Sequence, residues 1–563
     1  MEASKAQLLL AVVTLGGSMA AYWALNKRQR APTSPEQAPN YGSHGSSRWA
    51  TEAEVMKAFH DSGTGAILGR VQSGTKRRKG GSVEWRPVIF PWDQKAGNRF
   101  LLIIGPPGSG KTFCYTLPNL LHAASQDTRR SLVITDPKGD LHRRTSSRLA
   151  EAGFKVLVLN LVDFDASLRY NPMDTVRTPE DAQRLAATIV ANTEGPHAGG
   201  ESFWRHSEEA LIACLIWFVK ATRPDSEQHL ANVLHLAGAF AADKALMDRV
   251  FSKFEPGDPV RRLFAPVAGL EDKTRAGVFV GVTASRLKIW ASDRIAAITS
   301  GSDFDVRELG QTPTALYLII PDHDSTYRVL SSLFFDQCFQ QLISLADESG
   351  GRLPVECRLM LEEMANIGRI PDLEKRLATI RSRGLIVEMV LQTLGQVKQL
   401  YGDAWTTIVG CADTTLVLAA NDLETARYIS DRMGTTTIRT ASESVTQADR
   451  GASQGLSQQY TGRPLMTTEE VMGQGAGLRA EEILVIRRGL QARLLKMPVD
   501  SMPAWSTLES RKPVQATRRA PEQLALTDVS TISPVAQTPQ PQEKPVEKAE
   551  EKPQSGPSPS WAR

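Results

Sequence analysis

The feature that most constrains the fold is the octapeptide GPPGSGKT at residues 105–112. It fits the pattern G-x-x-x-x-G-K-[ST], in which glycines allow a tight loop whose backbone N–H groups face a phosphate. It follows the apolar run RFLLII and precedes the helical pattern TFCYTLPNLLHAA, the strand–loop–helix context that the motif requires. A Gly-rich turn without a ligand is the alternative, which this context disfavours. The sequence therefore predicts an α/β fold with a nucleotide site at the carboxyl end of a strand.

The motif assigns roles to individual side chains, with ATP and Mg²⁺ as the expected cofactors. Lys111 supplies positive charge to the β- and γ-phosphates, and the Thr112 hydroxyl is a ligand for Mg²⁺. The predicted nucleotide contacts are Gly105, Pro106, Pro107, Gly108, Ser109, Gly110, Lys111, Thr112 and Phe113.

A phosphate-binding loop (P-loop) such as this octapeptide also needs an acid at the end of another strand. The run RLMLEE ends in two such acids, Glu362 and Glu363. We expect Glu362 to complete the Mg²⁺ shell and Glu363 to orient or deprotonate the attacking water. Further along, GLIVEMVLQT ends in Gln392, whose amide is expected to sense the γ-phosphate or align the water. For each of these residues an ordinary strand end is the alternative.

The segment RSRG, just before that last strand, contains Arg381 and Arg383. An arginine presented to the next subunit's site would stabilise charge on the transferring phosphoryl group. A surface salt bridge is the equally weighted alternative. Of the two residues, Arg381 is the preferred candidate for the catalytic role.

Near-continuous apolar runs separated by helical patterns predict the rest of the sheet. We expect strands at residues 88–91, 99–104, 131–135, 155–160, 314–320, 358–361, 385–391 and 414–419. Runs of this kind are typical of a parallel sheet covered by helices on both faces.

Composition shifts divide the chain into six segments. We expect a membrane anchor (1–26), a tether (27–46), a nucleotide-binding domain in two parts (47–178 and 305–507), an all-helical insertion between them (179–304) and a tail (508–563). The tail is rich in Pro, Gln, Glu and Lys, so it is expected to be disordered. It is either a solvated extension or a docking arm for a partner protein.

Residues 8–25 contain no charge and, as a helix, would span about 27 Å. Lys27, Arg28 and Arg30 follow immediately, so the positive-inside rule places the bulk of the chain in the cytoplasm. A single-pass anchor is therefore predicted, with a cleaved signal peptide as the alternative.

Net charge excludes a protein that coats DNA, because 66 Lys+Arg oppose 62 Asp+Glu. Local basic groups remain, namely the run KRRK at 76–79 and Arg143, Arg144 and Arg148. The run would meet anionic lipid, contact phosphates or form a solvated hairpin tip. The three arginines would face a channel, where contact with the DNA backbone is independent of sequence. The turn DPKG, with Asp136 and Lys138, either lies near the nucleotide or a subunit boundary or only joins a strand to a helix.

In this order and spacing, the motifs resemble those of the coupling proteins of type IV secretion systems, of the TraG/TraD conjugative-transfer kind. The resemblance covers roughly residues 41–499. It is carried by GSSRWAT (45–51), GPPGSGKT, TDPKGDL (135–141), SFW (202–204), EEMANIG (362–368), LQTLGQVKQLYG (391–402) and RPLMTTEEV (463–471). This chain departs from the family pattern at Glu362-Glu363-Met364, where Asp-Glu-Phe is usual, and at Asp140, where Glu is usual.

The resemblance implies an α/β, RecA-like P-loop NTPase domain with an inserted all-α domain, an N-terminal transmembrane helix and a disordered C-terminal tail. It implies an inner-membrane, homo-hexameric ATPase that receives relaxase-bound single-stranded DNA or effector proteins and passes them to other secretion components. A nucleotide-gated receptor without motor activity and a chromosome-type DNA translocase are the alternatives. The inserted helical domain and the single short anchor disfavour the translocase.

Overall fold

The computed structural model describes residues 36–37, 42–72, 85–92, 99–193, 202–322, 324–448, 451–507, 512–515 and 524–529. At its centre lies a mixed sheet of eleven strands. They are β2 (Gly65–Gln72), β3 (Trp85–Pro91), β4 (Phe100–Ile104), β5 (Ser131–Asp136), β6 (Lys155–Asn160), β7 (Thr314–Ile319), β8 (Cys357–Leu361), β9 (Leu385–Leu391), β10 (Thr414–Val417), β13 (Glu482–Arg487) and β14 (Leu490–Leu495). Their order across the sheet is β3-β2-β14-β13-β10-β4-β9-β8-β5-β7-β6.

Seven neighbouring strands, from β10 to β6 in that order, run parallel. Burial on both faces explains their nearly continuous apolar sequences. Each of the eight predicted strand segments overlaps a strand of the sheet. Because parallel strands share one carboxyl edge, the ends of β4, β8 and β9 lie next to one another.

The other edge of the sheet is antiparallel, so a purely parallel sheet was the wrong expectation there. β13 pairs with β10, β14 with β13, β2 with β14 and β3 with β2, all antiparallel. β13 and β14 form a hairpin at Arg488 and Gly489, and Gly489 has a φ of 74°, which suits glycine in a tight turn.

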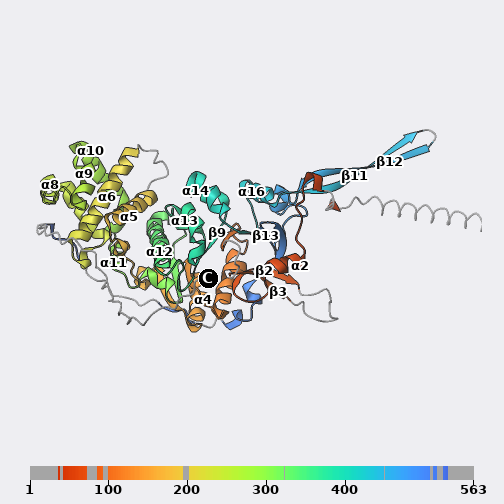
Figure 1. The fold of residues 1–563 in the computed structure, drawn as a ribbon, viewed down its shortest axis with the longest axis horizontal. Helices are drawn as coiled ribbons and strands as arrows, with labels where there is room; N and C mark the ends of the chain where they lie inside the picture. Colours follow the sequence, from red (N-terminus) through yellow and green to blue (C-terminus); the bar gives the residue numbers. More distant parts are fainter. Residues whose placement is uncertain are drawn as a thin grey trace, which may run out of the picture.

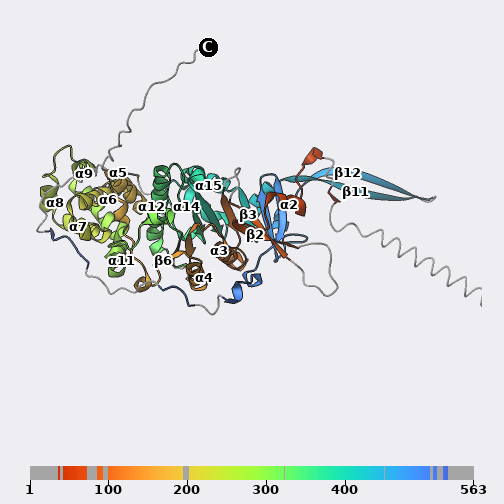
Figure 2. The same cartoon turned by 60° about the horizontal axis from the view of Figure 1, so that its bottom comes forward.

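Helices cover both faces of the sheet (Figure 2). On β5, Leu132 and Ile134 join a core cluster with α3 and α4, whereas Val133 faces the cluster on the opposite side. The helices of the first face are α2 (Glu52–Ala58), α3 (Leu117–Ser125) and α4 (Asp140–Glu151). Those packed in the opposite cluster are α12 (Arg328–Glu348), α13 (Leu373–Thr379), α14 (Leu394–Tyr401), α15 (Trp405–Gly410), α16 (Leu423–Met433) and α17 (Thr468–Val471).

The described residues between 179 and 304 contain helices and no strand. The helices are α5 (Pro179–Thr193), α6 (Ser202–Thr222), α7 (Leu230–Ala242), α8 (Lys244–Phe251), α9 (Pro259–Ala268), α10 (Asp272–Gly281) and α11 (Asp293–Ile298). They gather at one end of the molecule (Figure 1). The exact division of the chain into domains stays a prediction.

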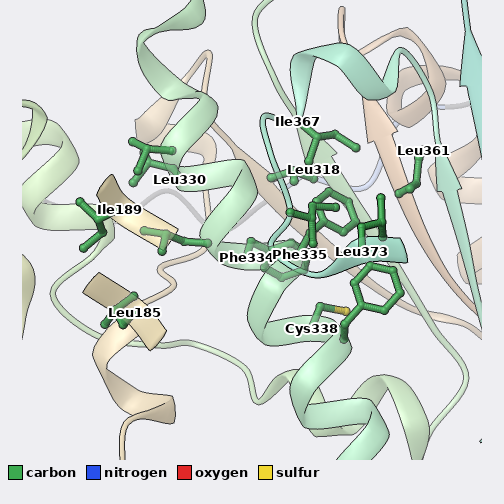
Figure 3. Close-up of a cluster of buried hydrophobic side chains, with 14 of the residues drawn as sticks. Leu185, Ile189, Leu318, Leu330, Phe334, Phe335, Cys338, Leu361, Ile367 and Leu373 are labelled. Atoms are coloured by element: carbon green, nitrogen blue, oxygen red, sulfur yellow. The ribbon is translucent and has the colours of Figure 1, made fainter. Parts of the chain in front are cut away.

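One continuous core joins these helices to the sheet. Leu185 and Ile189 of α5 lie toward α12, whose Phe334 and Phe335 lie toward Leu318 of β7 (Figure 3). The helical segment therefore sits on the sheet through α12.

At the opposite end of the molecule, a long hairpin projects from the sheet (Figure 1). It consists of β11 (Thr435–Ala448) and β12 (Gly451–Pro464), and β1 (Glu36–Gln37) pairs with β11. None of the strands predicted from the sequence lies in this three-stranded sheet.

Three predictions concern the ends and loops of the chain. Among the described residues, no helix is both long enough and apolar enough to cross a membrane. The predicted anchor at 8–25 and the basic run at 76–79 lie outside the described residues. The prediction of a wholly disordered tail is wrong for residues 512–515 and 524–529, because both pieces form hydrogen bonds with folded helices.

Candidate nucleotide site

The P-loop leaves β4 and is fixed to the neighbouring strand at once. The N–H of Gly105 donates to the Leu391 carbonyl of β9, at 3.0 Å. Gly108 and Gly110 have φ values of 79° and 90°, which side chains with a Cβ rarely adopt. The loop then continues into a π-helical turn, Thr112–Thr116, and into α3. Gly108 and Gly110 thus allow the tight loop that the sequence predicted.

Lys111 is buried and folded back on the loop. Its ammonium group donates to the carbonyl oxygens of Gly105 and Pro106. Burial lowers the pKa of Lys111, and the nearby carboxylates of Glu362 and Glu363 oppose that shift. Within the described part of the chain, the ammonium donates hydrogen bonds only to loop carbonyls, so it is well suited to turn toward an anionic phosphate.

Glu362 follows β8 and points at the start of the P-loop helix. Its carboxylate accepts a hydrogen bond from the Thr112 hydroxyl at 2.7 Å and another from the Thr116 hydroxyl at 2.9 Å. Burial raises the pKa of Glu362, while the two hydroxyl donors lower it. Hard oxygen donors so close together are what Mg²⁺ prefers, so the residues present fit this ion.

Glu363 points elsewhere, because its backbone is left-handed with a φ of 50°. Gln392 and Asn366 donate their amide N–H groups to its two carboxylate oxygens, each at 3.2 Å. Such a backbone is costly for a residue with a side chain and is often found at functional sites. The two adjacent acids therefore have different hydrogen-bond partners.

The structure brings five predicted residues together at the carboxyl edge of β4, β8 and β9, namely Lys111, Thr112, Glu362, Glu363 and Gln392. Their catalytic and metal-binding roles stay predictions.

Arg381 is not part of this cluster. It lies in the 3₁₀ turn Ile380–Arg383, before β9 begins, at the edge of the sheet away from the P-loop. It is exposed and has no hydrogen bond or ion pair with the described part of the chain, whereas Arg383 is paired with Asp347. A catalytic role for Arg381 would therefore require that it reach the nucleotide site of a neighbouring subunit.

Phe113, predicted among the nucleotide contacts, is 39% exposed. Its ring meets the edge of Trp505, with ring centroids 6.1 Å apart, and the guanidinium of Arg144 lies 5.5 Å from the Trp505 ring. One of the three predicted channel arginines thus contacts the chain that follows the sheet.

Two residues of the site were missed. Thr116 lies one helical turn after Thr112, a spacing that would have revealed it. Lys496, at the end of β14, donates to the Ser109 carbonyl at 2.9 Å and to the Ala480 carbonyl at 2.7 Å. No sequence signal links a lysine so far along the chain to the P-loop.

Asp136 bonds within the strand-to-helix turn, while a position near the nucleotide or a subunit boundary stays a prediction. Its buried carboxylate accepts the His142 N–H at 2.8 Å, so it caps the start of α4.

Comparison with known proteins identifies relatives over most of the chain. The sequence model of the family described as type IV secretory system conjugative DNA transfer matches residues 48–496. The conjugal transfer protein TraG of Rhizobium radiobacter is 24% identical over 477 residues, which cover 79% of this chain and 70% of that protein. Protein VirD4 of the same species is 25% identical over 419 residues, 73% of this chain and 57% of that protein.

Among solved structures, the unbound bacterial conjugative coupling protein TrwBdeltaN70 superposes with a TM-score of 0.55. It is 17% identical, and the match covers 80% of this chain and 92% of that one. The plasmid coupling protein TrwB in complex with the ATP analogue ADPNP gives the same TM-score at 16% identity, covering 81% and 96%. At these identities the likeness shows the fold alone.

Proposed function

The chain belongs to the type IV secretory system conjugative DNA transfer family, and from this premise we propose that it is an ATP-hydrolysing coupling protein. It recruits relaxase-bound single-stranded DNA, effector proteins or both, and drives them into the secretion channel. The proposal includes a homo-hexamer, a single-pass anchor at residues 8–25 in the inner membrane and a cytoplasmic location for the bulk of the chain.

The observation that carries the proposal is the meeting of the P-loop with the acid pair. Lys111 and Thr112 come from the loop after β4, whereas Glu362 and Glu363 follow β8, and the Thr112 hydroxyl bonds Glu362 directly. A Gly-rich turn without a ligand has no need of a buried ammonium, a hydroxyl and two separated carboxylates.

Each residue then has a defined task. Lys111 exchanges the carbonyls of Gly105 and Pro106 for the β- and γ-phosphates. Thr112 and Glu362 hold Mg²⁺, which neutralises negative charge on the phosphates.

Glu363 accepts a proton from the attacking water. Gln392 and Asn366 hold its carboxylate in place through their amide N–H groups. Arg381 of one subunit faces the site of the next subunit in the hexamer, where it stabilises negative charge.

The test is Lys111→Ala in the full chain, assayed for ATP hydrolysis, membrane insertion and transfer of cargo. The expected result is loss of hydrolysis and of transfer with normal insertion. Lys155→Ala is the matched control, because Lys155 is exposed at the amino end of β6 and pairs with Glu308. Normal transfer by Lys111→Ala would contradict the proposal.

A further inference from the structure

One face of α7 is polar in an otherwise apolar helix. Within Leu230–Ala242 the only polar side chains are Asn232 and His235, and His229 caps the helix by accepting the Asn232 N–H on its Nδ1. Residues three apart lie on the same face of a helix, so these three side chains line one surface. All three bond to residues 524–529 of the C-terminal tail.

Thr527 is the centre of this contact and is 2% exposed. Its N–H donates to the Asn232 amide oxygen at 3.0 Å, and its hydroxyl accepts from the Asn232 amide nitrogen at 2.8 Å. The same hydroxyl donates to the Glu227 carboxylate at 2.6 Å. A threonine hydroxyl can donate one hydrogen bond and accept two. Here it donates to Glu227 and accepts from Asn232, so both capacities are used.

The two histidines form hydrogen bonds with backbone carbonyls of the tail. His229 Nε2 lies 2.8 Å from the Ala525 carbonyl, and His235 Nε2 lies 3.2 Å from the Thr527 carbonyl. Because a carbonyl oxygen only accepts, each Nε2 carries the proton. In His229 this agrees with Nδ1, which accepts the Asn232 N–H and is therefore unprotonated.

The apolar residues of the segment fit an extended chain. Leu524 and Val529 pack against the main core, whereas Leu526 is 45% exposed. From Ala525 to Val529, partly or fully buried residues alternate with exposed ones, a period of two.

The α7 side of the contact presents buried polar atoms that need hydrogen-bond partners. Asn232 and His229 are both fully buried. Among the described residues, the Asn232 amide oxygen and the His229 Nε2 bond only to the tail segment. Buried polar atoms without a partner are costly, so these two atoms favour an occupied surface.

We propose that this face of α7 is a binding site for an extended peptide with a central threonine and apolar residues two positions before and after it, as Ala525 and Val529 stand around Thr527, and that residues 524–529 fill it as a latch. A partner protein that presents such a segment must displace the latch to reach the site. The inference goes beyond the proposed function, since neither the site nor its test involves nucleotide.

The tail is also fixed before it reaches the latch. The Val514 N–H donates to the Ser146 hydroxyl at 3.0 Å, and His142 Nε2 donates to the Val514 carbonyl at 2.8 Å, both on α4. This attachment shortens the tether and raises the local concentration of the latch at α7. A free peptide therefore competes poorly while the latch is intact.

The test measures binding of a fluorescent peptide of residues 521–531 to the full-length chain by anisotropy. Thr527→Val removes the hydroxyl with little change of shape, so the latch weakens and the peptide binds roughly tenfold tighter or more than to wild type. Leu526→Ala is the matched control, because that side chain is exposed, and it should bind the peptide as wild type does. Adding His235→Ala to Thr527→Val removes a bond on the α7 side and should reverse part of the gain.

Equal binding to wild type and Thr527→Val, or no binding to either, would overturn the latch. Hydrogen exchange on the wild-type chain gives an independent measurement. The Thr527 amide should exchange slowly in wild type and in Leu526→Ala and faster in Thr527→Val, and rapid exchange in wild type would also overturn the proposal.

Discussion

Two threonines in distant parts of the molecule make nearly the same bond. The Thr112 hydroxyl lies 2.7 Å from the Glu362 carboxylate in the nucleotide site, and the Thr527 hydroxyl lies 2.6 Å from the Glu227 carboxylate on the helical segment. Thr112 is exposed, whereas Thr527 is almost fully buried. The first pair joins an exposed hydroxyl to a buried carboxylate at the carboxyl edge of the sheet, whereas the hydroxyl of the second pair is itself buried.

This difference distinguishes a site held by bonds between individual side chains from a site held by a whole chain segment. At the P-loop, the internal bonds are made by individual side chains such as Lys111 and Thr112, and the proposed phosphate and cation would replace them by local movement. At α7, five hydrogen bonds join one short segment to the helix and its approach, so the segment leaves as a unit. The following predictions test whether the two regions respond independently.

The largest expected effect concerns the buried support of the nucleotide site. Tyr115, in the turn after the P-loop, donates to Glu388 at 2.8 Å, and Arg358 forms an ion pair with the same carboxylate inside the sheet. Arg358→Met leaves Glu388 as a buried charge without its cation, so the free energy of unfolding should fall by about 3–5 kcal/mol. Chemical denaturation measures this change.

Arg307→Met is the control for that substitution, because Arg307 and its partner Glu348 are partly exposed. It should cost no more than about 1 kcal/mol. If both variants lose the same free energy, the buried pair of Arg358 and Glu388 supports the fold no more than an exposed pair does.

A smaller effect is expected from Thr112→Val. This change removes one oxygen from the predicted Mg²⁺ site, so the apparent Mg²⁺ affinity for supporting binding of a fluorescent ATP analogue should fall on the order of 10- to 100-fold. The hydrogen exchange of residues 524–529 should not change. Thr527→Val should show the reverse pattern, and a shared response would break the distinction between the two sites.

The smallest effect is the pH dependence of stability. Burial lowers the pKa values of His122, His142 and His229, and the last two donate to tail carbonyls. A lowered pKa means that the folded chain binds fewer protons than the unfolded chain. Stability is therefore complete above the ordinary histidine pKa of about 6.5 and is lost as the pH falls below it.

Between pH 7.5 and 5.5 the free energy of unfolding should fall by about 1–2 kcal/mol. His229→Gln, which cannot be protonated, should show a shallower fall. An increase in stability on acidification would contradict the sign of these shifts.

The sequence predicted the parallel part of the sheet well because each of those strands is buried on both faces and reads as one apolar run. The strands of the antiparallel edge were harder to predict from the sequence. β14 alternates partly buried and buried residues, and β2 contains Gly69 where Leu495 approaches closely. Neither strand presents the continuous apolar pattern.

Residues of the nucleotide site could be predicted where a sequence motif assigns a role to each position, as it does for Lys111 and Thr112. Glu363 could be placed at a strand end, but its left-handed backbone, which turns it toward Gln392, has no sequence signature. The latch was beyond prediction for another reason. The tail's composition predicts disorder, yet residues 524–529, with one buried threonine, bond to Asn232 and Glu227, which lie 295 and 300 residues before Thr527.

The central claim is that hydrolysis at the P-loop drives transfer, and Glu363→Gln tests it most directly. The amide has the size of the carboxylate but cannot accept the proton from water, so ATP binding should persist while hydrolysis falls by about 10²- to 10⁴-fold. Glu348→Gln, an exposed acid far from the site, controls for loss of charge. We expect cargo transfer to stop in Glu363→Gln and to continue in Glu348→Gln. Full transfer by Glu363→Gln despite lost hydrolysis would show instead a nucleotide-gated receptor without motor activity.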